Sequence, residues 1–217
     1  TKNKFDKENH YDKNFESIIR SKKLYKYYHS LVSKYYKFNI LEKSSVLEIG
    51  CGNGDLLNSV NPENGVGIDI SNKFIDLAKS QYPNLTFYCD TLDSFELNDK
   101  FDYVIISGLI GDIKDIENFL IKLKKFCRDD TKIIISYYNK IWEPLLKLAE
   151  IFKLKTSQTA QNWISKNDIK NFIFLSDYEV IRSYNKIIFP LSIPFFSSFL
   201  NIFIANLPFI RSLCLLS

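Results

Sequence analysis

The stretch VLEIGCGNGDLL, residues 46–57, decides the fold. Gly50, Gly52 and Gly54 form a G-x-G-x-G loop between an apolar run, which predicts a buried strand, and a segment that predicts a short helix. Glycine is needed where a backbone turns sharply or where a ligand approaches within contact distance, and a tight turn alone would also explain the triplet. The spacing differs from the dinucleotide fingerprint G-x-G-x-x-G, and Glu48 at the strand end would be unfavourable beside a pyrophosphate.

Outside this stretch, segments with strand and helix patterns alternate along the chain. The expected strands cover residues 44–50, 65–70, 84–90, 101–107 and 131–138. The expected helices between them cover residues 55–60, 71–80 and 115–127, and Ser71 is the expected N-cap of the second. Such alternation predicts βαβ units and therefore an α/β fold with a doubly wound, mostly parallel sheet. Ligands of such sheets bind at the carboxyl ends of the strands.

Acidic residues stand at three consecutive strand ends. Asp69 ends the second strand, nineteen residues after Gly50, and Asp90 ends the third. A carboxylate at the position of Asp69 can accept both hydroxyl groups of a ribose, and Asp90 would lie within reach of an adenine amino group. Solvation alone explains this pattern poorly, so the sequence favours a ligand that contains a nucleoside.

These motifs resemble those of a known family. VLEIGCGNG, GIDIS and FYCDTLDS resemble motifs I, II and III of the class I S-adenosylmethionine-dependent methyltransferases. FDYVIISGLIGDI and KKFCRDDTKIIISYYN resemble the fourth and fifth strands of that family, so the resemblance covers roughly residues 44–139. More loosely, residues 137–169 are similar to a bacterial subgroup found beside, or fused to, glycosyltransferases of surface polysaccharide synthesis.

The resemblance implies a Rossmann-like, seven-stranded sheet whose last strand is antiparallel. A sixth strand is expected at residues 178–189, within a segment at 177–190 that reads as a strand pair or one long strand. The seventh strand would start near Leu213, so we expect it to be short or truncated. Helices are expected at residues 141–154 and 166–176.

The resemblance also implies S-adenosylmethionine as the cofactor, with no metal site. The three glycines would form the floor under the methionine and ribose, and Glu48 would support the loop and the amino group. Asp69 would bind the ribose and Asp90 the adenine, while Cys51 reads as a small packing residue rather than a nucleophile. The cofactor-binding residues implied are Glu48, Gly50, Cys51, Gly52, Gly54, Asp69, Ile70, Asp90, Thr91 and Ser107.

Candidates for the acceptor side follow the fourth and fifth strands. Methyl transfer is an in-line displacement, so positioning supplies most of the catalysis, and a hydroxyl or amine acceptor must also lose a proton. Asp112 is the candidate base, although a helix N-cap would explain it equally. Tyr138 could line the acceptor pocket and attract a sulfonium by about 0.5–2 kcal/mol, and core packing is the alternative. His29 is the third catalytic candidate, with a solvated surface position as the alternative. Further acceptor-side candidates are Ser107, Leu109, Tyr137, Asn139 and Trp163.

The N-terminal segment, residues 1–43, is expected to be separate from the methyltransferase domain at 44–217. It carries eleven of the basic residues against five acidic ones, whereas the rest of the chain is slightly acidic. The first nineteen residues are polar and aperiodic, which predicts a mobile arm. Residues 20–37 have helical spacing with a basic outer face, and this helix is expected to cover the donor as a lid.

An uncharged run at residues 187–210 is the most unusual feature of the C-terminal part. Its length would allow a membrane span, but Pro190, Pro194 and Pro208 argue against a lipid-exposed helix. We expect a helical insertion at about 190–210 that packs between the last two strands. The alternative is an interfacial patch that contacts a bilayer or a lipid-linked acceptor, as a peripheral membrane contact.

Composition excludes several classes of protein. With 46% hydrophobic and 25% charged residues, the chain matches an ordinary globular protein, and a net charge of +4 is too small to indicate nucleic acid. Its four widely spaced cysteines favour reduced thiols in the cytoplasm.

The expected function is S-adenosylmethionine-dependent methyl transfer to a small-molecule or saccharide- or lipid-linked acceptor. The alternatives are a non-catalytic nucleotide-binding module that partners a glycosyltransferase, and a nicotinamide-dependent oxidoreductase.

Overall fold

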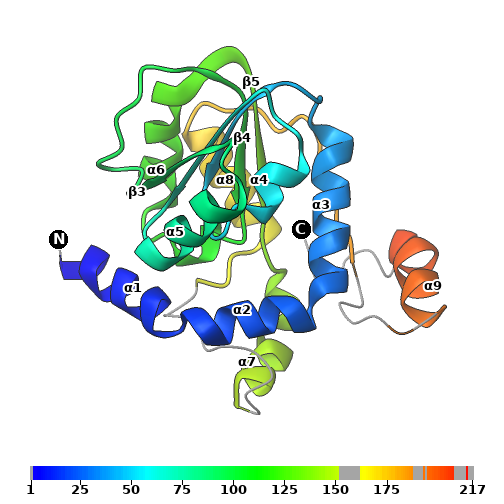
Figure 1. Cartoon of the computed structure of the whole chain (residues 1–217). Helices are drawn as coiled ribbons and strands as arrows, with labels where there is room; N and C mark the ends of the chain where they lie inside the picture. The colour runs from blue at the N-terminus through cyan, green and yellow to red at the C-terminus, as the bar shows by residue number, and fades with distance from the viewer. Residues whose placement is uncertain (1, 152–161, 188–192, 194, 208–213, 215–217) are drawn as a thin grey trace.

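A parallel sheet of five strands forms the centre of the molecule (Figure 1). The computed structural model describes residues 2–151, 162–187, 193, 195–207 and 214. The strand order is β3-β2-β1-β4-β5, and every described strand pair is parallel. The strands are β1 (Ser45–Ile49), β2 (Asn64–Asp69), β3 (Thr86–Cys89), β4 (Phe101–Ser107) and β5 (Cys127–Ser136). The predicted doubly wound α/β architecture is confirmed in these five strands.

Helices cover both faces of the sheet (Figure 1). The α-helices are α1 (Lys2–Lys13), α2 (Phe15–Leu24), α3 (Lys26–Asn39), α4 (Asp55–Ser59), α5 (Asn72–Gln81), α6 (Ile116–Leu123), α7 (Glu143–Ile151), α8 (Lys166–Leu175) and α9 (Phe196–Ile202). The 3₁₀ turns are η1 (Ile110–Asp112), η2 (Lys124–Phe126), η3 (Lys140–Trp142) and η4 (Ile204–Asn206). Ser71 accepts a hydrogen bond from the backbone N–H of Phe74, which confirms it as the N-cap of α5.

Two hydrophobic cores form because successive strand residues point to opposite faces of the sheet. In β4, Ile105 packs with α3, α4 and α5, whereas Val104 and Ile106 pack with α6 and α8. All three are fully buried. Burying each such side chain stabilises the fold by about 1.5–3 kcal/mol. This burial on both faces explains why the strands read as continuous apolar runs.

The N-terminal segment differs from the predicted mobile arm. Residues 2–13 form α1, and the single helix expected at 20–37 is divided at Tyr25 into α2 and α3. The ring of Phe15 contacts that of Phe74 on α5 at 4.9 Å between centroids. Polar side chains of α1 also bind α5. Because a helix attached in this way needs no apolar face, its sequence shows no apolar periodicity from which it could be predicted. Figure 1 shows α1 and α2 crossing one end of the sheet, with α3 along its side.

The expected sixth strand is also absent from the described part of the chain. Residues 178–187 contain only an isolated bridge at Lys186, and residues 188–190 lie outside the described part. A strand requires a hydrogen-bonding neighbour, and residues 178–187 do not pair along the open edge of β5, the last strand of the described sheet. Ile181 and Tyr184 are accordingly exposed rather than packed on a core. The expected seventh strand near Leu213 falls on residues outside the description.

The C-terminal insertion is helical where it is described, with α9 and η4 beside α3 (Figure 1). None of the described helices has the length and apolar character that crossing a membrane would need. Residues 152–161, which include the end of the helix expected at 141–154, lie outside the described part.

Candidate active site

A cavity of about 950 Å³ lies at the carboxyl ends of the strands, enclosed on its other side by α1, α2 and α3. This is the edge at which parallel α/β sheets bind their ligands. All the predicted cofactor-binding residues except Gly54 line it, as do the three catalytic candidates. They are His29, Glu48, Gly50, Cys51, Gly52, Asp69, Ile70, Asp90, Thr91, Ser107, Asp112 and Tyr138.

The glycine loop turns the chain from β1 into α4 beneath this cavity. The N–H of Gly50 donates to the carbonyl of Ile68 at 2.8 Å, which fixes the start of the loop against β2. Gly52 has φ +52°, and no described atom lies within 4 Å of the place where a Cβ would stand. The backbone at Gly52 therefore offers an open cradle to a ligand.

Gly54 is packed against the neighbouring strand rather than placed on the cavity wall. It has φ +78° and begins α4, and a Cβ there would lie only 2.7 Å from Cζ of Phe87. It does not line the cavity. Gly54 is therefore required for close packing between α4 and β3, and the expectation that it contacts the cofactor is not supported by its position.

Asp69 is held rigidly at the end of β2. Its Oδ2 accepts the N–H of Gly52 at 2.9 Å, and its Oδ1 accepts the N–H of Ser71 at 3.0 Å. Burial raises the pKa of this carboxyl above its usual range, although these hydrogen bonds oppose the rise. The side chain lines the cavity with both oxygens oriented, and each oxygen retains a second lone pair for a ligand hydroxyl.

Glu48 is a buried carboxyl group in the cavity wall. It is 2% exposed, and its Oε2 has no hydrogen-bond partner among the described residues. Burial raises its pKa to about 8, with the nearby Lys22 acting in the opposite direction. A buried carboxyl oxygen without a partner is costly unless a ligand supplies a donor. An ammonium group would satisfy it.

Asp90 is engaged within its own loop. Its Oδ1 accepts the N–H of Thr91 at 2.7 Å and the hydroxyl of Ser94. Its backbone N–H donates to the carbonyl of Asp69 at 2.9 Å, so the ends of β2 and β3 are joined at the cavity edge. Asp90 thus shapes the loop as well as lining the cavity.

The N-terminal helices bring two residues to the cavity that sequence reasoning missed. The Tyr11 hydroxyl donates to Oδ2 of Asp112 at 2.9 Å across the cavity. Lys22 of α2 donates to Asn53 in the glycine loop and lies 3.4 Å from Oδ2 of Asp55. Both depend on the packing of helices distant in sequence, and no local motif signals them.

Asp112 ends the 3₁₀ turn η1 and is only 9% exposed. The alternative that it caps a helix is wrong, because Asp115 caps α6 by accepting the N–H of Asn118 at 3.0 Å. The carboxyl group of Asp112 faces the cavity instead, with Tyr11 hydrogen-bonded to it.

His29 and Tyr138 enter the cavity from α3 and from the end of β5. Burial lowers the pKa of His29 to about 4, with the positive charge of Lys22 adding to the effect. The imidazole is therefore neutral near pH 7, and it is half-buried in the cavity wall. The Tyr138 ring stacks on Tyr28 at 6.1 Å between centroids, and burial raises its pKa.

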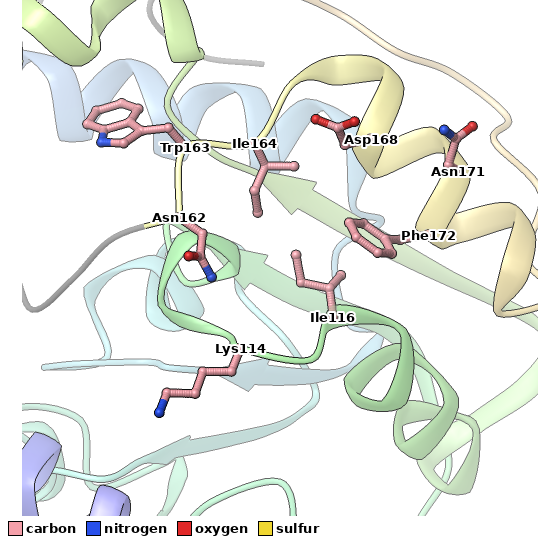
Figure 2. A pocket seen from close by; sticks show the side chains of 8 residues that line it. All are labelled: Lys114, Ile116, Asn162, Trp163, Ile164, Asp168, Asn171 and Phe172. Carbon is pink, nitrogen blue, oxygen red and sulfur yellow. The ribbon is translucent and has the colours of Figure 1, made fainter.

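Only some of the remaining acceptor-side candidates line the cavity. Leu109 lines the cavity, whereas Tyr137 packs in the core beneath α6 and α8. Trp163 lies at a second, shallow pocket of about 380 Å³ between the start of α6 and α8. Figure 2 shows Ile116, Ile164 and Phe172 converging in this pocket while the Trp163 ring extends away from them. Asn139 caps η3 by accepting the N–H of Ile141.

The two pockets are adjacent. Lys114 lines both of them. Asn162 of the shallow pocket donates from its backbone N–H to the carbonyl of Gly111 at 2.7 Å and from Nδ2 to the carbonyl of Ile113 at 3.0 Å. These bonds fix the loop that carries Asp112.

Comparison with known proteins gives concordant matches. A family model described as a methyltransferase domain matches residues 20–182. A ubiquinone biosynthesis O-methyltransferase of Rickettsia typhi is 24% identical over 162 residues, which cover 68% of this chain and 62% of the relative. A second such protein, from Rickettsia prowazekii, is 25% identical and is covered to 60%. The chain therefore spans about three fifths of the length of these curated relatives.

Solved structures share the fold. An S-adenosylmethionine-dependent methyltransferase from Thermotoga maritima superposes with a TM-score of 0.70 at 13% identity, covering 85% of this chain and 87% of that one. Magnesium protoporphyrin IX methyltransferase from Synechocystis, with bound S-adenosylhomocysteine, gives a TM-score of 0.67 at 17% identity. It covers 89% of this chain and 95% of that one.

Proposed function

The chain belongs to the methyltransferase-domain family, and from this premise we propose that it transfers a methyl group from S-adenosylmethionine to a bound acceptor. The observation that carries the proposal is the set of polar groups at the strand ends. An open glycine cradle, an oriented carboxylate at Asp69 and a buried carboxyl oxygen of Glu48 without a partner among the described residues lie around one cavity. These groups fit a ligand that lies against the backbone of the glycine loop and carries two ribose hydroxyls and an ammonium group.

Each residue has a distinct binding role in this proposal. Gly50 and Gly52 let the ligand approach the backbone, Asp69 accepts the ribose hydroxyls, and Glu48 accepts the ammonium group. The bound cofactor supplies a methyl group already activated on a sulfonium. The chain therefore has to align donor and acceptor and to exclude water, which the covering helices α1 and α2 do.

The acceptor side of the cavity suits an acceptor that must lose a proton, such as a hydroxyl or an amine. Asp112 carries a carboxylate into the cavity, with Tyr11 donating to it, and we propose that Asp112 takes the acceptor proton. The Rickettsia relatives are named as O-methyltransferases, which supports oxygen as the methylated atom. We propose a small-molecule or a saccharide- or lipid-linked acceptor. A panel of phenols, sugars and lipid extracts, assayed with labelled S-adenosylmethionine, tests this choice.

We propose the cytoplasm as the location. Cys51, Cys89, Cys127 and Cys214 form no disulfide with one another in the described part of the chain. Free thiols are typical of a reducing compartment.

Binding of S-adenosylhomocysteine, measured by titration calorimetry, tests the cofactor directly. Asp69→Asn should weaken binding by at least roughly tenfold, because it removes charged acceptors of the ribose hydroxyls. Asp76→Asn, on the exposed face of α5, is the matched control and should bind like the unaltered protein. Equal affinity of the Asp69 variant, or no binding by the unaltered protein, would contradict the proposal.

A further inference from the structure

Helix α9 has its polar and apolar faces reversed. Ser197 and Asn201 are four residues apart and are buried, at 2% and 4% exposure, and Ala205 in the following turn η4 continues this buried side at 0% exposure. Phe199 and Phe203 have the same spacing on another side and are 52% and 63% exposed. A helix on a globular protein normally buries its apolar side and exposes its polar side. Here the aromatic side faces outward.

The orientation of α9 is fixed by hydrogen bonds on its inner side. Nδ2 of Asn201 donates to the hydroxyl of Tyr27 on α3 at 3.4 Å. The hydroxyl of Ser197 accepts the N–H of Ile193 at 2.8 Å. Rotating α9 to bury its phenylalanines would break the contact with Tyr27, so Asn201 holds the aromatic face toward the exterior, whereas the Ser197 bond stabilises the start of the helix locally. Other exposed apolar side chains around it are Ile193, Phe195, Ile202 and Leu207.

A basic stripe lies on the neighbouring helix. Lys26, Lys34 and Lys37 are exposed on α3, whose sequence contains no acidic residue. Lys34 follows Tyr27 by seven residues, which is about two helical turns, so it lies on the side of α3 that Asn201 contacts. Phe38, at 83% exposure, continues this surface beyond the stripe. Figure 1 shows α9 standing beside α3, away from the sheet.

We propose that the aromatic side of α9 and the lysine stripe of α3 together form a docking surface for an anionic lipid bilayer. Phenylalanines next to lysines match a bilayer interface, because the rings enter the acyl boundary while the ammonium groups bind anionic headgroups. The chemistry does not suit a second copy of this chain. A symmetric contact would bring each basic stripe close to the other and would be repulsive. The surface would place the enzyme where a lipid-linked acceptor is found.

Vesicle flotation tests the surface without reference to catalysis. The protein should float with phosphatidylcholine vesicles that contain about 30% phosphatidylglycerol, and much less with phosphatidylcholine alone. Flotation should fall as NaCl rises from about 0.05 to 0.5 M, because salt screens the lysines. Absence of flotation with anionic vesicles, or equal flotation with neutral ones, would overturn the proposal.

Two sets of variants separate the contributions. The double variant Phe199→Ser, Phe203→Ser should lose flotation by roughly tenfold or more, and Lys34→Glu, Lys37→Glu should lose it at low salt. Phe174→Ser is the matched control. Phe174 is 78% exposed on α8, which packs on the opposite face of the sheet from α3, so flotation should be unchanged.

Binding of S-adenosylhomocysteine checks that the variants are folded and distinguishes this proposal from methyl transfer. The two variants should keep the affinity of the unaltered protein for S-adenosylhomocysteine. Lipid binding without any cofactor binding would contradict the proposed function and leave the docking surface supported. A dimer in light scattering that disappears in the phenylalanine variant would instead assign the surface to a second copy and overturn the bilayer proposal.

Discussion

Glu48 shows how one buried carboxyl group links ligand binding to the stability of the fold. Its pKa is about 8 in the folded chain, against an ordinary value of 4.5. Between these values the folded state binds the proton that the unfolded state has released. The free energy of unfolding should therefore fall as pH rises from about 4.5 through 8.

Glu48→Gln should remove this dependence. The glutamine keeps the shape of the side chain but carries no titrating proton, so the variant should be more stable than the unaltered protein at pH 8.5, by roughly 2–4 kcal/mol. The two proteins should be similar near pH 4.5. Urea unfolding at a series of pH values measures the difference. A constant difference between the two proteins from pH 4.5 to 8.5 would show that Glu48 does not titrate in this range.

Tyr11 affects a second carboxyl group of the cavity, that of Asp112. Its hydroxyl donates to Oδ2 of Asp112, and a donated hydrogen bond stabilises the ionised carboxylate. Tyr11→Phe should therefore remove this stabilisation of the Asp112 carboxylate. If Asp112 accepts the acceptor proton, the acidic limb of the kcat/KM profile should move to higher pH.

The pH profile of methyl transfer, with an acceptor identified from the panel, measures this shift. Tyr88→Phe is the control, since Tyr88 is 40% exposed on β3 and does not line the cavity. A loss of activity that is the same at every pH would argue against a role for Tyr11 in tuning Asp112.

At the scale of single elements, the turn from β1 into α4 uses its glycines for two purposes. Gly54→Ala should destabilise the fold by roughly 2–4 kcal/mol, because a Cβ at φ +78° would collide with the buried Phe87 ring. Gly52→Ala should cost less stability, since its Cβ would meet no described atom, but it should weaken binding of S-adenosylhomocysteine more.

Thermal unfolding and calorimetry on the two variants measure this difference. The pair is its own control, because each variant adds one methyl group to the same loop at a positive φ. If Gly54→Ala were no less stable than Gly52→Ala, close packing would not be the reason for Gly54.

The central strands β1, β2 and β4 were predictable from sequence because both of their faces are buried. Ile105 and its neighbours form continuous apolar runs, and the acids that end the strands share one edge of the sheet by the geometry of parallel pairing. The N-terminal helix α1 was not predictable, since it attaches through polar side chains such as Asp12. The prediction of a strand at 178–187 was wrong for another reason. The residue pattern suits a strand, but strand formation depends on a hydrogen-bonding neighbour that local sequence does not specify.

At the scale of the whole molecule, the N-terminal helices form a cover that is attached less firmly than the core. The contacts of α1 with α5 are mostly polar: Asn72 donates to Glu8 at 2.8 Å, and Lys73 donates to the carbonyl of Asp12 at 3.0 Å. Exposed polar contacts of this kind contribute little free energy each. We therefore expect α1 and α2 to open locally more often than the sheet does.

Binding of S-adenosylhomocysteine should slow amide hydrogen exchange in α1 and α2 by roughly tenfold or more, because Tyr11 and Lys22 line the cavity that the ligand fills. Helix α8, which does not line that cavity, should change little. Hydrogen-exchange mass spectrometry makes the comparison. Equal slowing in all helices would indicate general stabilisation rather than closure of a cover.

A continuous series of hydrogen bonds joins α1 to the glycine loop. The hydroxyl of Ser71 donates to Asp12, its backbone N–H donates to Asp69, and Asp69 accepts the N–H of Gly52. The evolutionary consequence is that a change at position 12 alters the partner of position 71, and through it the carboxylate assigned to the ribose. Among homologous sequences, an acid at position 12 should therefore occur together with a hydroxyl residue at position 71.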